Sequence, residues 1–420
     1  METSITKLVV FGILTRFVYY IWMVVSSSIL PPYDLQTYLL SDTVSPFLAP
    51  FSSWDGVHFL SIAMKGYIHE HQHAFFPLFP YFVRTVTHLL GFAADDANGY
   101  IFIGVLISLV SFNIALVTLY KMTKDYSNED FAYKTGILFC VAPASVFLTS
   151  AYTESLYGCL SLLACYFLYN KKNVMMSCLF FFVASFVRSN GLINLGFVLY
   201  YFVDNILPFA SFPKVHKKVT VRLVVSTVLL VISNLLPFVL YDHFAAEKFC
   251  NMTPKPTYCG GIGKLYSYIQ ARYWNQGFLK YWRLIEIPNF LLCAPAVIIS
   301  LIVCGYYLVN YFIRHPLFRS LCKSTQLEES KSDTQNGKGM KNNDLLVYFV
   351  HLLALVVFGL FCMHTQVITR FVSACPAFYW GIVWITQQKV FGMLRYVPVF
   401  YSVFYTFFGG VMFASFYPWT

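Results

Sequence analysis

The acidic residues of this 420-residue chain are few, and one of them has a context that suits acid–base chemistry. Only 19 Asp and Glu residues are present. Asp55 follows Trp54 and precedes Gly56, soon after the first long apolar stretch. A glycine lets the backbone turn or approach a ligand closely, and a carboxylate can accept the proton of an attacking hydroxyl group. Asp55 is therefore our candidate general base; a second, compatible interpretation is that Asp55 caps the start of a helix.

Three further charged residues lie at the ends of apolar stretches. Glu154 joins two such stretches with almost no loop, where it can meet the positive end of the following helix. Arg188 and Arg370 each end an apolar stretch on the side opposite the basic loops, and a charge placed against that bias often has a partner. Arginine can donate two hydrogen bonds to a phosphate. We therefore consider both arginines candidate phosphate ligands; the alternative is that they extend toward lipid headgroups.

A polar segment follows Asp55 and contains Lys65, Glu70 and three histidines at alternate positions, His69, His71 and His73. Side chains at i, i+2 and i+4 share a face only on a strand, and nothing here predicts one. Metal ligation by these histidines is therefore disfavoured relative to contact with a polar substrate or a place at the membrane interface. We expect no metal site.

A second polar segment, residues 242–285, combines aromatic and amide side chains, including Trp274 and Asn275. Such a mixture stacks on sugars and hydrogen-bonds to them, although aromatic belts are also normal at membrane interfaces. Alone, this segment does not distinguish a sugar site from an interfacial loop.

The composition is that of a membrane protein. The chain is 58% hydrophobic and 11% charged, with a mean hydropathy of +0.62, which leaves too few polar residues for a soluble domain. The net charge of +10 is spread in short clusters between apolar stretches, which argues against a nucleic-acid partner.

Apolar stretches of roughly the length that crosses a bilayer recur along the chain. They predict a single all-α polytopic membrane domain, 1–420, with about 11 helices and a shorter apolar piece, 74–90, at the interface. The expected helices are 8–30, 99–120, 135–152, 155–170, 173–188, 190–207, 219–241, 286–313, 344–363, 371–387 and 396–416.

The connecting segments alternate in character. One set is basic and includes the polar tract 314–343; by the positive-inside rule it faces the cytosol. The other set includes 31–100 and 242–285 and is expected on the lumenal side.

Two weaker signals favour the same orientation. Cys250 and Cys259 are a candidate disulfide, and Asn251 begins a glycosylation sequon; both suit an oxidising lumen. The sequence offers no physical explanation for the charge of Arg16 inside the first expected helix.

Six segments in fixed order carry a family resemblance. They are Trp54–Tyr67, Ala74–Pro80, Thr153–Leu156, Arg188–Gly191, Tyr273–Trp282 and His364–Phe371, with Cys375 and Pro376 behind the last. Together they resemble the PIG-V family, the family of GPI mannosyltransferase 2, over most of the chain.

The resemblance implies a GT-C-type architecture in the endoplasmic reticulum membrane, with an active site built from lumenal loops. It implies dolichyl phosphate mannose as donor, with no cofactor. It also implies a mannosyl-glucosaminyl-(acyl)phosphatidylinositol acceptor, α1,6 transfer of a second mannose in GPI-anchor biosynthesis, and inversion at the anomeric carbon. The expected partners are membrane lipids, these two lipid-linked substrates and an accessory subunit of the same membrane, since one is known for this activity in fungi.

The same resemblance suggests roles for individual residues. Asp55 is the expected base, and the leaving phosphate is assigned to Arg370 or Arg188, with His364 or Lys65 assisting. The residues expected to bind substrate are Trp54, Lys65, Glu70, Glu154, Arg188, Asn190, Trp274, Asn275, His364, Gln366 and Arg370.

Three other functions remain open at this stage. One is a GT-C transferase that uses the same donor on another acceptor, such as a lipid-linked oligosaccharide. Another is a lipid-linked-sugar transporter, which should carry inverted repeats and charges near the bilayer midplane; Arg16 fits that class better than an enzyme. The third is a non-catalytic subunit that presents substrate.

Overall fold

Helices form all the regular structure in the described part of the chain. The computed structural model describes residues 2–33, 40–41, 43–206, 220–251, 255–314, 340 and 342–419. Most of the predicted cytosolic tract 314–343 lies outside these residues. The all-α expectation is confirmed for the part that the structure describes.

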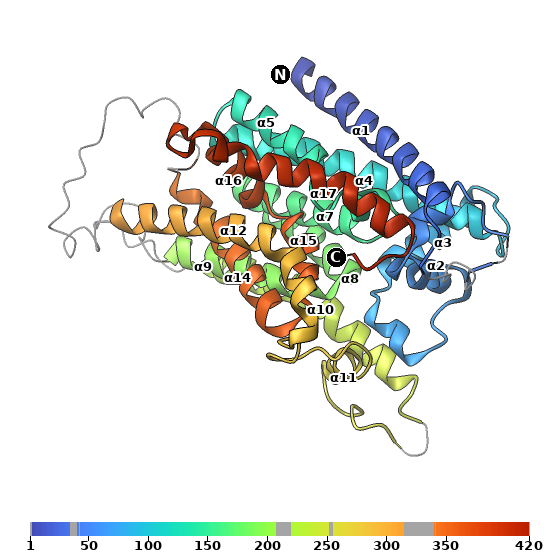
Figure 1. Cartoon of the computed structure of the whole chain (residues 1–420). Helices are drawn as coiled ribbons and strands as arrows, with labels where there is room; N and C mark the ends of the chain where they lie inside the picture. Colours follow the sequence, from blue (N-terminus) through green and yellow to red (C-terminus); the bar gives the residue numbers. More distant parts are fainter. Residues whose placement is uncertain are drawn as a thin grey trace.

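Both long and short helices occur along the chain (Figure 1). Their bounds are α1 Glu2–Ile29, α2 Asp55–Lys65, α3 Leu78–Leu89, α4 Ala97–Tyr126, α5 Glu129–Cys140, α6 Ser145–Thr149, α7 Glu154–Cys165, α8 Val174–Val187, α9 Leu195–Ile206, α10 Val221–Glu247, α11 Lys264–Tyr273, α12 Ile287–Arg314, α14 Leu346–Cys362, α15 Ile368–Val372, α16 Pro376–Gln387 and α17 Val397–Ala414.

Six of the described helices are long and apolar enough to cross a bilayer by length and composition: α1, α4, α10, α12, α14 and α17. The bent pair of α15 and α16 makes a seventh if it counts as one span. The chain is therefore a multi-pass membrane protein, and the expected count of about 11 spans stays a prediction.

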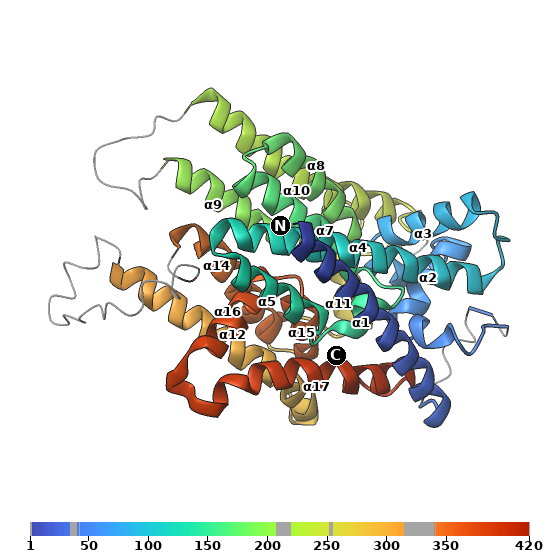
Figure 2. The same ribbon diagram turned by 90° about the horizontal axis from the view of Figure 1, so that it is seen from above.

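The two ends of the helix bundle differ in what they carry. The C-terminal ends of α9 and α12 lie at one end, whereas α2, α3 and α11 gather at the other (Figures 1 and 2). This separation matches the two alternating sets of connecting segments in the sequence.

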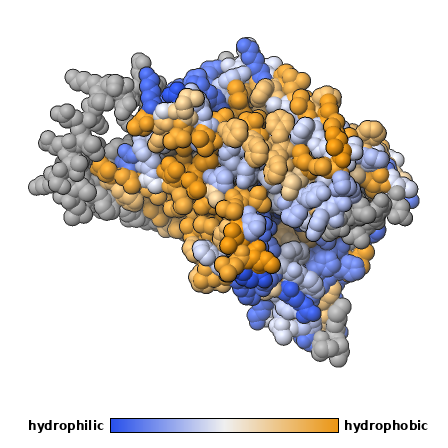
Figure 3. Space-filling model, viewed as in Figure 1, coloured by the Kyte–Doolittle hydropathy of each residue, from blue (hydrophilic) through white to orange (hydrophobic). Residues whose placement is uncertain are grey.

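An apolar surface covers the flank between these ends. Hydrophobic residues dominate the face in Figure 3, and hydrophilic residues gather around α11. On α12 and α17 the exposed side chains include Leu291, Ile298, Val309, Phe400 and Phe404. Such a flank fits contact with lipid chains rather than water.

Helices from opposite ends of the chain pack together. The Trp22 indole of α1 donates to the backbone carbonyl of Phe407 in α17 at 2.8 Å, and the two rings meet edge-on at 5.7 Å. The first and last long helices of the chain, α1 and α17, therefore lie side by side in the bundle (Figure 2).

The segments between the expected membrane helices contain shorter helices, and α2 begins at Asp55, as the helix-start interpretation of that residue expects. The segment 31–100 includes α2 and α3, and 242–285 includes α11. The interfacial apolar piece expected at 74–90 corresponds to α3, Leu78–Leu89. Apolar runs alone missed α2 and α11 because these helices are short and bury only one face.

Two expected helices are broken at prolines. The predicted helix 135–152 is divided into α5 and α6 around Pro143, and the expected helix 371–387 begins only at Pro376, after a bend of 82° from α15. Proline has no N–H to donate and clashes with the preceding turn, which accounts for both breaks.

Arg16 has a structural partner at the first of these breaks. Its guanidinium donates to the carbonyl of Cys140, the last residue of α5, to the Ser145 carbonyl at 3.2 Å and to the Thr149 hydroxyl at 3.0 Å. The side chain is buried, 4% exposed, and lies 4.5 Å from the centre of the Phe112 ring. Arg16 therefore ties the end of α5 to α6, and a cation suits a helix C-terminus.

Replacing Arg16 with methionine should lower the stability of the fold without touching the polar end of the bundle. The change leaves buried carbonyls without their donor, which costs about 1–3 kcal/mol. We expect the Tm of the purified protein in detergent to fall by a few degrees. Lys7→Met, at an exposed position on the same helix, is the matched control. An unchanged Tm for Arg16→Met would show that these contacts do not hold α5 to α6.

Candidate active site

A large cavity opens at the end of the bundle that carries α2 and α11. Its volume is about 920 Å³, near the upper end of the range for ligand-binding pockets. The polar residues that line it are Asp55, Thr153, Arg188, Ser189, Asn190, Ser267, Gln270, Gln276, Asn289, His364, Gln366 and Arg370. Aromatic residues, among them Trp54, Tyr152, Tyr266 and Trp274, form much of the remaining wall.

Asp55 is the first residue of α2, and its position is fixed from the neighbouring α6–α7 turn. The Tyr152 hydroxyl donates to the Ser53 carbonyl at 2.9 Å. A Cβ on Gly56 would stand 3.2 Å from the Tyr152 ring, so glycine permits this close approach. Trp54 turns the chain with a φ of 56°. Asp55 is one-third exposed and faces the cavity.

Three charged side chains converge beside Asp55. Arg370 Nη1 donates to Asp55 Oδ2 at 2.9 Å, and Arg370 Nε donates to Glu154 Oε1 at 2.6 Å. Arg188 Nη1 pairs with the same Glu154 oxygen and donates to the Thr153 hydroxyl at 3.0 Å. Two carboxylates and two guanidinium groups thus form a network with no net charge, assembled from α2, α7, α15 and the end of α8.

Glu154 lies beneath the cavity rather than on its wall. It is 4% exposed and is absent from the lining. Burial alone raises the pKa of the Glu154 carboxyl, but Arg188 and Arg370 outweigh it and hold that pKa below its ordinary value. The structure therefore places Glu154 behind the cavity wall, where it holds the two arginines, and its expected contact with substrate stays a prediction.

The opposite wall is formed by α11 and the segment before α15. His364 Nε2 donates to the Trp274 carbonyl at 2.6 Å, and its ring stacks on Tyr281 with centres 4.5 Å apart. The Tyr281 hydroxyl donates to Gln366 Oε1 at 2.7 Å. Trp274, His364 and Gln366 all line the cavity, and so does Asn190 on the side of Arg188.

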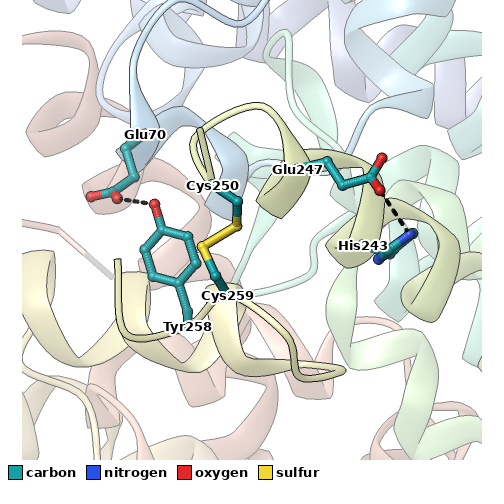
Figure 4. Close-up of a disulfide and its surroundings, with 6 residues drawn as sticks. All are labelled: Glu70, His243, Glu247, Cys250, Tyr258 and Cys259. Atoms are coloured by element: carbon teal, nitrogen blue, oxygen red, sulfur yellow. Dashed lines mark hydrogen bonds and ion pairs between the residues drawn. A yellow bond between two sulfur atoms is a disulfide. The ribbon is translucent and has the colours of Figure 1, made fainter. Parts of the chain in front are cut away.

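Three expected substrate contacts lie elsewhere. Lys65 ends α2, and at about 1.5 Å per residue this helix carries it about 15 Å from Asp55. Glu70 does not line the cavity. It accepts a hydrogen bond from the Tyr258 hydroxyl at 2.6 Å (Figure 4) and another from the Tyr273 hydroxyl at 2.8 Å. Asn275 is exposed in a tight turn, with a φ of 49°. Membership of a motif did not guarantee a place in the cavity.

The lumenal signals of the segment 242–285 lie beside Glu70. Cys250 and Cys259 form a disulfide (Figure 4). Asn251 is exposed, whereas the next two residues of its sequon lie outside the described residues. No group of three His, Cys, Asp or Glu side chains that could hold a metal ion occurs in the part of the chain that is described.

Sequence reasoning missed several residues of the cavity. Tyr152, Ser189 and Asn289 all line it. Tyr152 stands two residues before Glu154 and Ser189 directly follows Arg188, so adjacency to a charged candidate was an available signal. Asn289 lies just inside α12 and offered no comparable signal.

Comparisons with known proteins show which family this chain resembles. The family model described as Mannosyltransferase (PIG-V) matches residues 5–420. The GPI alpha-1,6-mannosyltransferase 2 of Homo sapiens is 33% identical over 389 residues, covering 83% of this chain and 76% of the human protein. The Mus musculus protein of the same name is 34% identical, covering 80% and 73%.

More distant similarities were found as well. The GPI mannosyltransferase 2 of Cryptococcus neoformans is 28% identical, covering 85% of this chain and 82% of that protein. The apo form of the Archaeoglobus fulgidus oligosaccharyltransferase aligns with a TM-score of 0.45 at 10% identity, covering 96% of this chain and 56% of that one. The match to the family model over nearly the whole sequence shows that this chain belongs to the PIG-V mannosyltransferase family.

Proposed function

We propose that this GPI-anchor mannosyltransferase adds the second mannose, in α1,6 linkage, to the mannosyl-glucosaminyl-(acyl)phosphatidylinositol intermediate. Dolichyl phosphate mannose is the proposed donor, and the cavity faces the lumen of the endoplasmic reticulum in a GT-C-type architecture. The observation that carries the proposal is Asp55, a carboxylate on the cavity wall 2.9 Å from the guanidinium of Arg370. The printed names of the human and mouse relatives support the linkage.

The proposed reaction is a direct displacement at the anomeric carbon of the donor mannose. The acceptor O6 forms a bond to that carbon as the bond to the phosphate oxygen breaks, so a β-linked donor gives an α-mannoside. The acceptor hydroxyl proton passes to Asp55, and the departing dolichyl phosphate takes the electron pair. Because the phosphate already activates the donor, the proposal includes no cofactor or metal ion.

Arg370 is the proposed ligand of the leaving phosphate. It lines the cavity and contacts Asp55 directly, so a phosphate bound to it would stand beside the base. Phosphate binding there competes with Asp55 for Arg370 Nη1 and thereby frees the carboxylate to accept a proton. Glu154 keeps the guanidinium in place meanwhile, through Nε at 2.6 Å. Arg188 supports the network from the other side of Glu154.

The proposal also covers location and partners. The lipid-linked substrates place the enzyme in the endoplasmic reticulum membrane, among membrane lipids. An accessory membrane subunit of that compartment is part of the proposal, carried by the family resemblance.

Depleting the protein from cells and labelling their lipids with radioactive mannose tests the proposed reaction. We expect a GPI precursor with one mannose to accumulate, and wild-type protein but not Asp55→Asn to restore the longer lipids, because the amide cannot accept the proton. Asp95→Asn, at an exposed carboxylate outside the cavity, is the matched control. Normal GPI lipids after depletion, or full rescue by Asp55→Asn at normal expression, contradict the proposal.

Substitution of the two arginines separates their roles. Arg370→Gln should lower kcat/KM for the donor by about 10²–10³-fold, because it removes the proposed charge stabilisation of the leaving phosphate. Arg188→Gln should lower it by about tenfold or less, since its contact is with Glu154 and Thr153. Arg370→Lys should recover part of the loss by keeping a cation.

The control for these variants is Arg222→Gln, at an exposed position at the start of α10. Rates measured in membranes at matched expression decide the assignment. A larger loss of kcat/KM with Arg188→Gln than with Arg370→Gln would assign phosphate binding to Arg188 instead of Arg370.

Chelation tests the absence of a metal requirement. Transfer by purified enzyme in excess EDTA should stay within about twofold of the untreated rate, because no divalent ion is needed to neutralise a single lipid phosphate held by arginine. A loss of about tenfold or more that added Mg²⁺ or Mn²⁺ reverses would contradict this mechanism.

A further inference from the structure

The cavity has a charged region and an uncharged region. Asp55, Arg188 and Arg370 mark the charged region on the side of α2, α8 and α15. The cavity-lining residues of α11 and of the turn after it are Tyr266, Ser267, Gln270, Trp274 and Gln276, none of which is charged. A phosphate needs the first region, whereas the second offers amides, hydroxyls and aromatic rings.

Gln270 and Trp274 have the chemistry to receive a neutral sugar. In the described part of the chain the Gln270 side-chain amide has no hydrogen-bond partner, although it is partly buried and lines the cavity. An amide both donates and accepts, as a pair of sugar hydroxyls requires. The Trp274 ring meets Phe75 at 6.0 Å and supplies an apolar face for the C–H side of a sugar ring.

The position of α11 is set at its first turn. The Asp242 carboxylate accepts hydrogen bonds from the backbone N–H of Gly263 at 2.7 Å and of Tyr266 at 2.9 Å. The Tyr266 hydroxyl also lies 2.6 Å from that of Ser189, beside Arg188. The start of α11 is thereby attached to α10 and to the charged region.

The far end of α11 is held by Glu70 and His364. Glu70 accepts from the hydroxyl of Tyr273, the last residue of α11, and from that of Tyr258, next to the disulfide Cys250–Cys259 (Figure 4). His364 donates to the Trp274 carbonyl at 2.6 Å. Contacts from two separate segments, Glu70 to Tyr273 and His364 to Trp274, therefore fix the orientation of Gln270 and Trp274 relative to Asp55.

We infer that Gln270 and Trp274 form the subsite for the sugars of the acceptor, and that Glu70 is a positioning residue for it. This inference rests on the proposed function and adds to it the part of the cavity that selects the acceptor. The donor mannosyl phosphate occupies the charged region, and the acceptor approaches from α11 with its attacking hydroxyl toward Asp55. Glu70 acts through Tyr258 and Tyr273 and touches neither substrate.

Binding measured without turnover tests the subsite. In the Asp55→Asn background, Gln270→Ala and Trp274→Ala should each weaken binding of radiolabelled synthetic mannosyl-glucosaminyl-phosphatidylinositol about five- to tenfold, the loss of one or two polar or stacking contacts. Binding of radiolabelled dolichyl phosphate mannose should change by less than about twofold, since its phosphate lies in the charged region.

Glu70 requires a second pair of variants. Glu70→Ala should raise the acceptor KM of the otherwise wild-type enzyme by about five- to tenfold while the donor KM stays within about twofold. Glu70→Gln should recover part of the loss, because an amide oxygen can still accept a tyrosine hydrogen bond. Lys264→Ala, exposed on α11 and outside the cavity lining, is the matched control, and elution from a sizing column verifies the fold of each variant.

The outcomes separate this inference from the proposed function. Unchanged acceptor affinity in both Gln270→Ala and Trp274→Ala overturns the subsite, as does an equal loss of donor affinity. Wild-type protein that fails to bind this acceptor also overturns it. Wild-type protein that binds both lipids with these variant effects but transfers no mannose supports the subsite and overturns the proposed function.

Discussion

The cavity depends on a buried carboxylate that two arginines neutralise. Glu154 is 4% exposed, and a charge at such a position is stable only with close partners and hydrogen bonds. Arg370 and Arg188 supply both, from α15 and from the end of α8. Removing one partner of a buried pair costs about 3–5 kcal/mol of stability. The ion pairs of Glu154 therefore hold α7, α8 and α15 together. Asp55 is joined to this centre through Arg370, and α2 is positioned with it.

Local context in the sequence was enough to find the charged residues but not their pairing. Asp55, Arg188 and Arg370 stood out because each departs from the pattern around it, and all three line the cavity. The contacts of Arg370 with Glu154 and with Asp55 join residues 216 and 315 positions apart, and no periodicity carries information over such separations. Lys65 lies outside the cavity for the opposite reason. It is close in sequence to Asp55, but the two residues are at opposite ends of a helix of 11 residues. A motif records neighbours along the chain, whereas a site requires neighbours in space.

The same limit explains what the sequence could and could not give of the fold. Apolar runs located both ends of α12 to within one residue, expected at 286–313 and found at Ile287–Arg314, but missed one end of α1, α4 and α10 by six residues. They did not reveal α11, whose position is fixed by hydrogen bonds to Asp242 and Glu70. Arg16 was unexplained as a charge in a membrane helix, and the transporter alternative drew support from it. Its donation to the carbonyl of Cys140 at the end of α5 provides a structural explanation that needs no transported substrate.

The distance along the chain between the paired charges has a consequence for biogenesis. Glu154 enters the ribosomal tunnel 216 residues before Arg370, which at 5–20 residues per second is an interval of about ten to forty seconds. During that interval the nascent protein holds the two carboxylates of the network with at most one of their arginines. Completion of the charge balance therefore waits for Arg370, and a polypeptide that terminates between Arg188 and Arg370 carries one more carboxylate than arginine in this network.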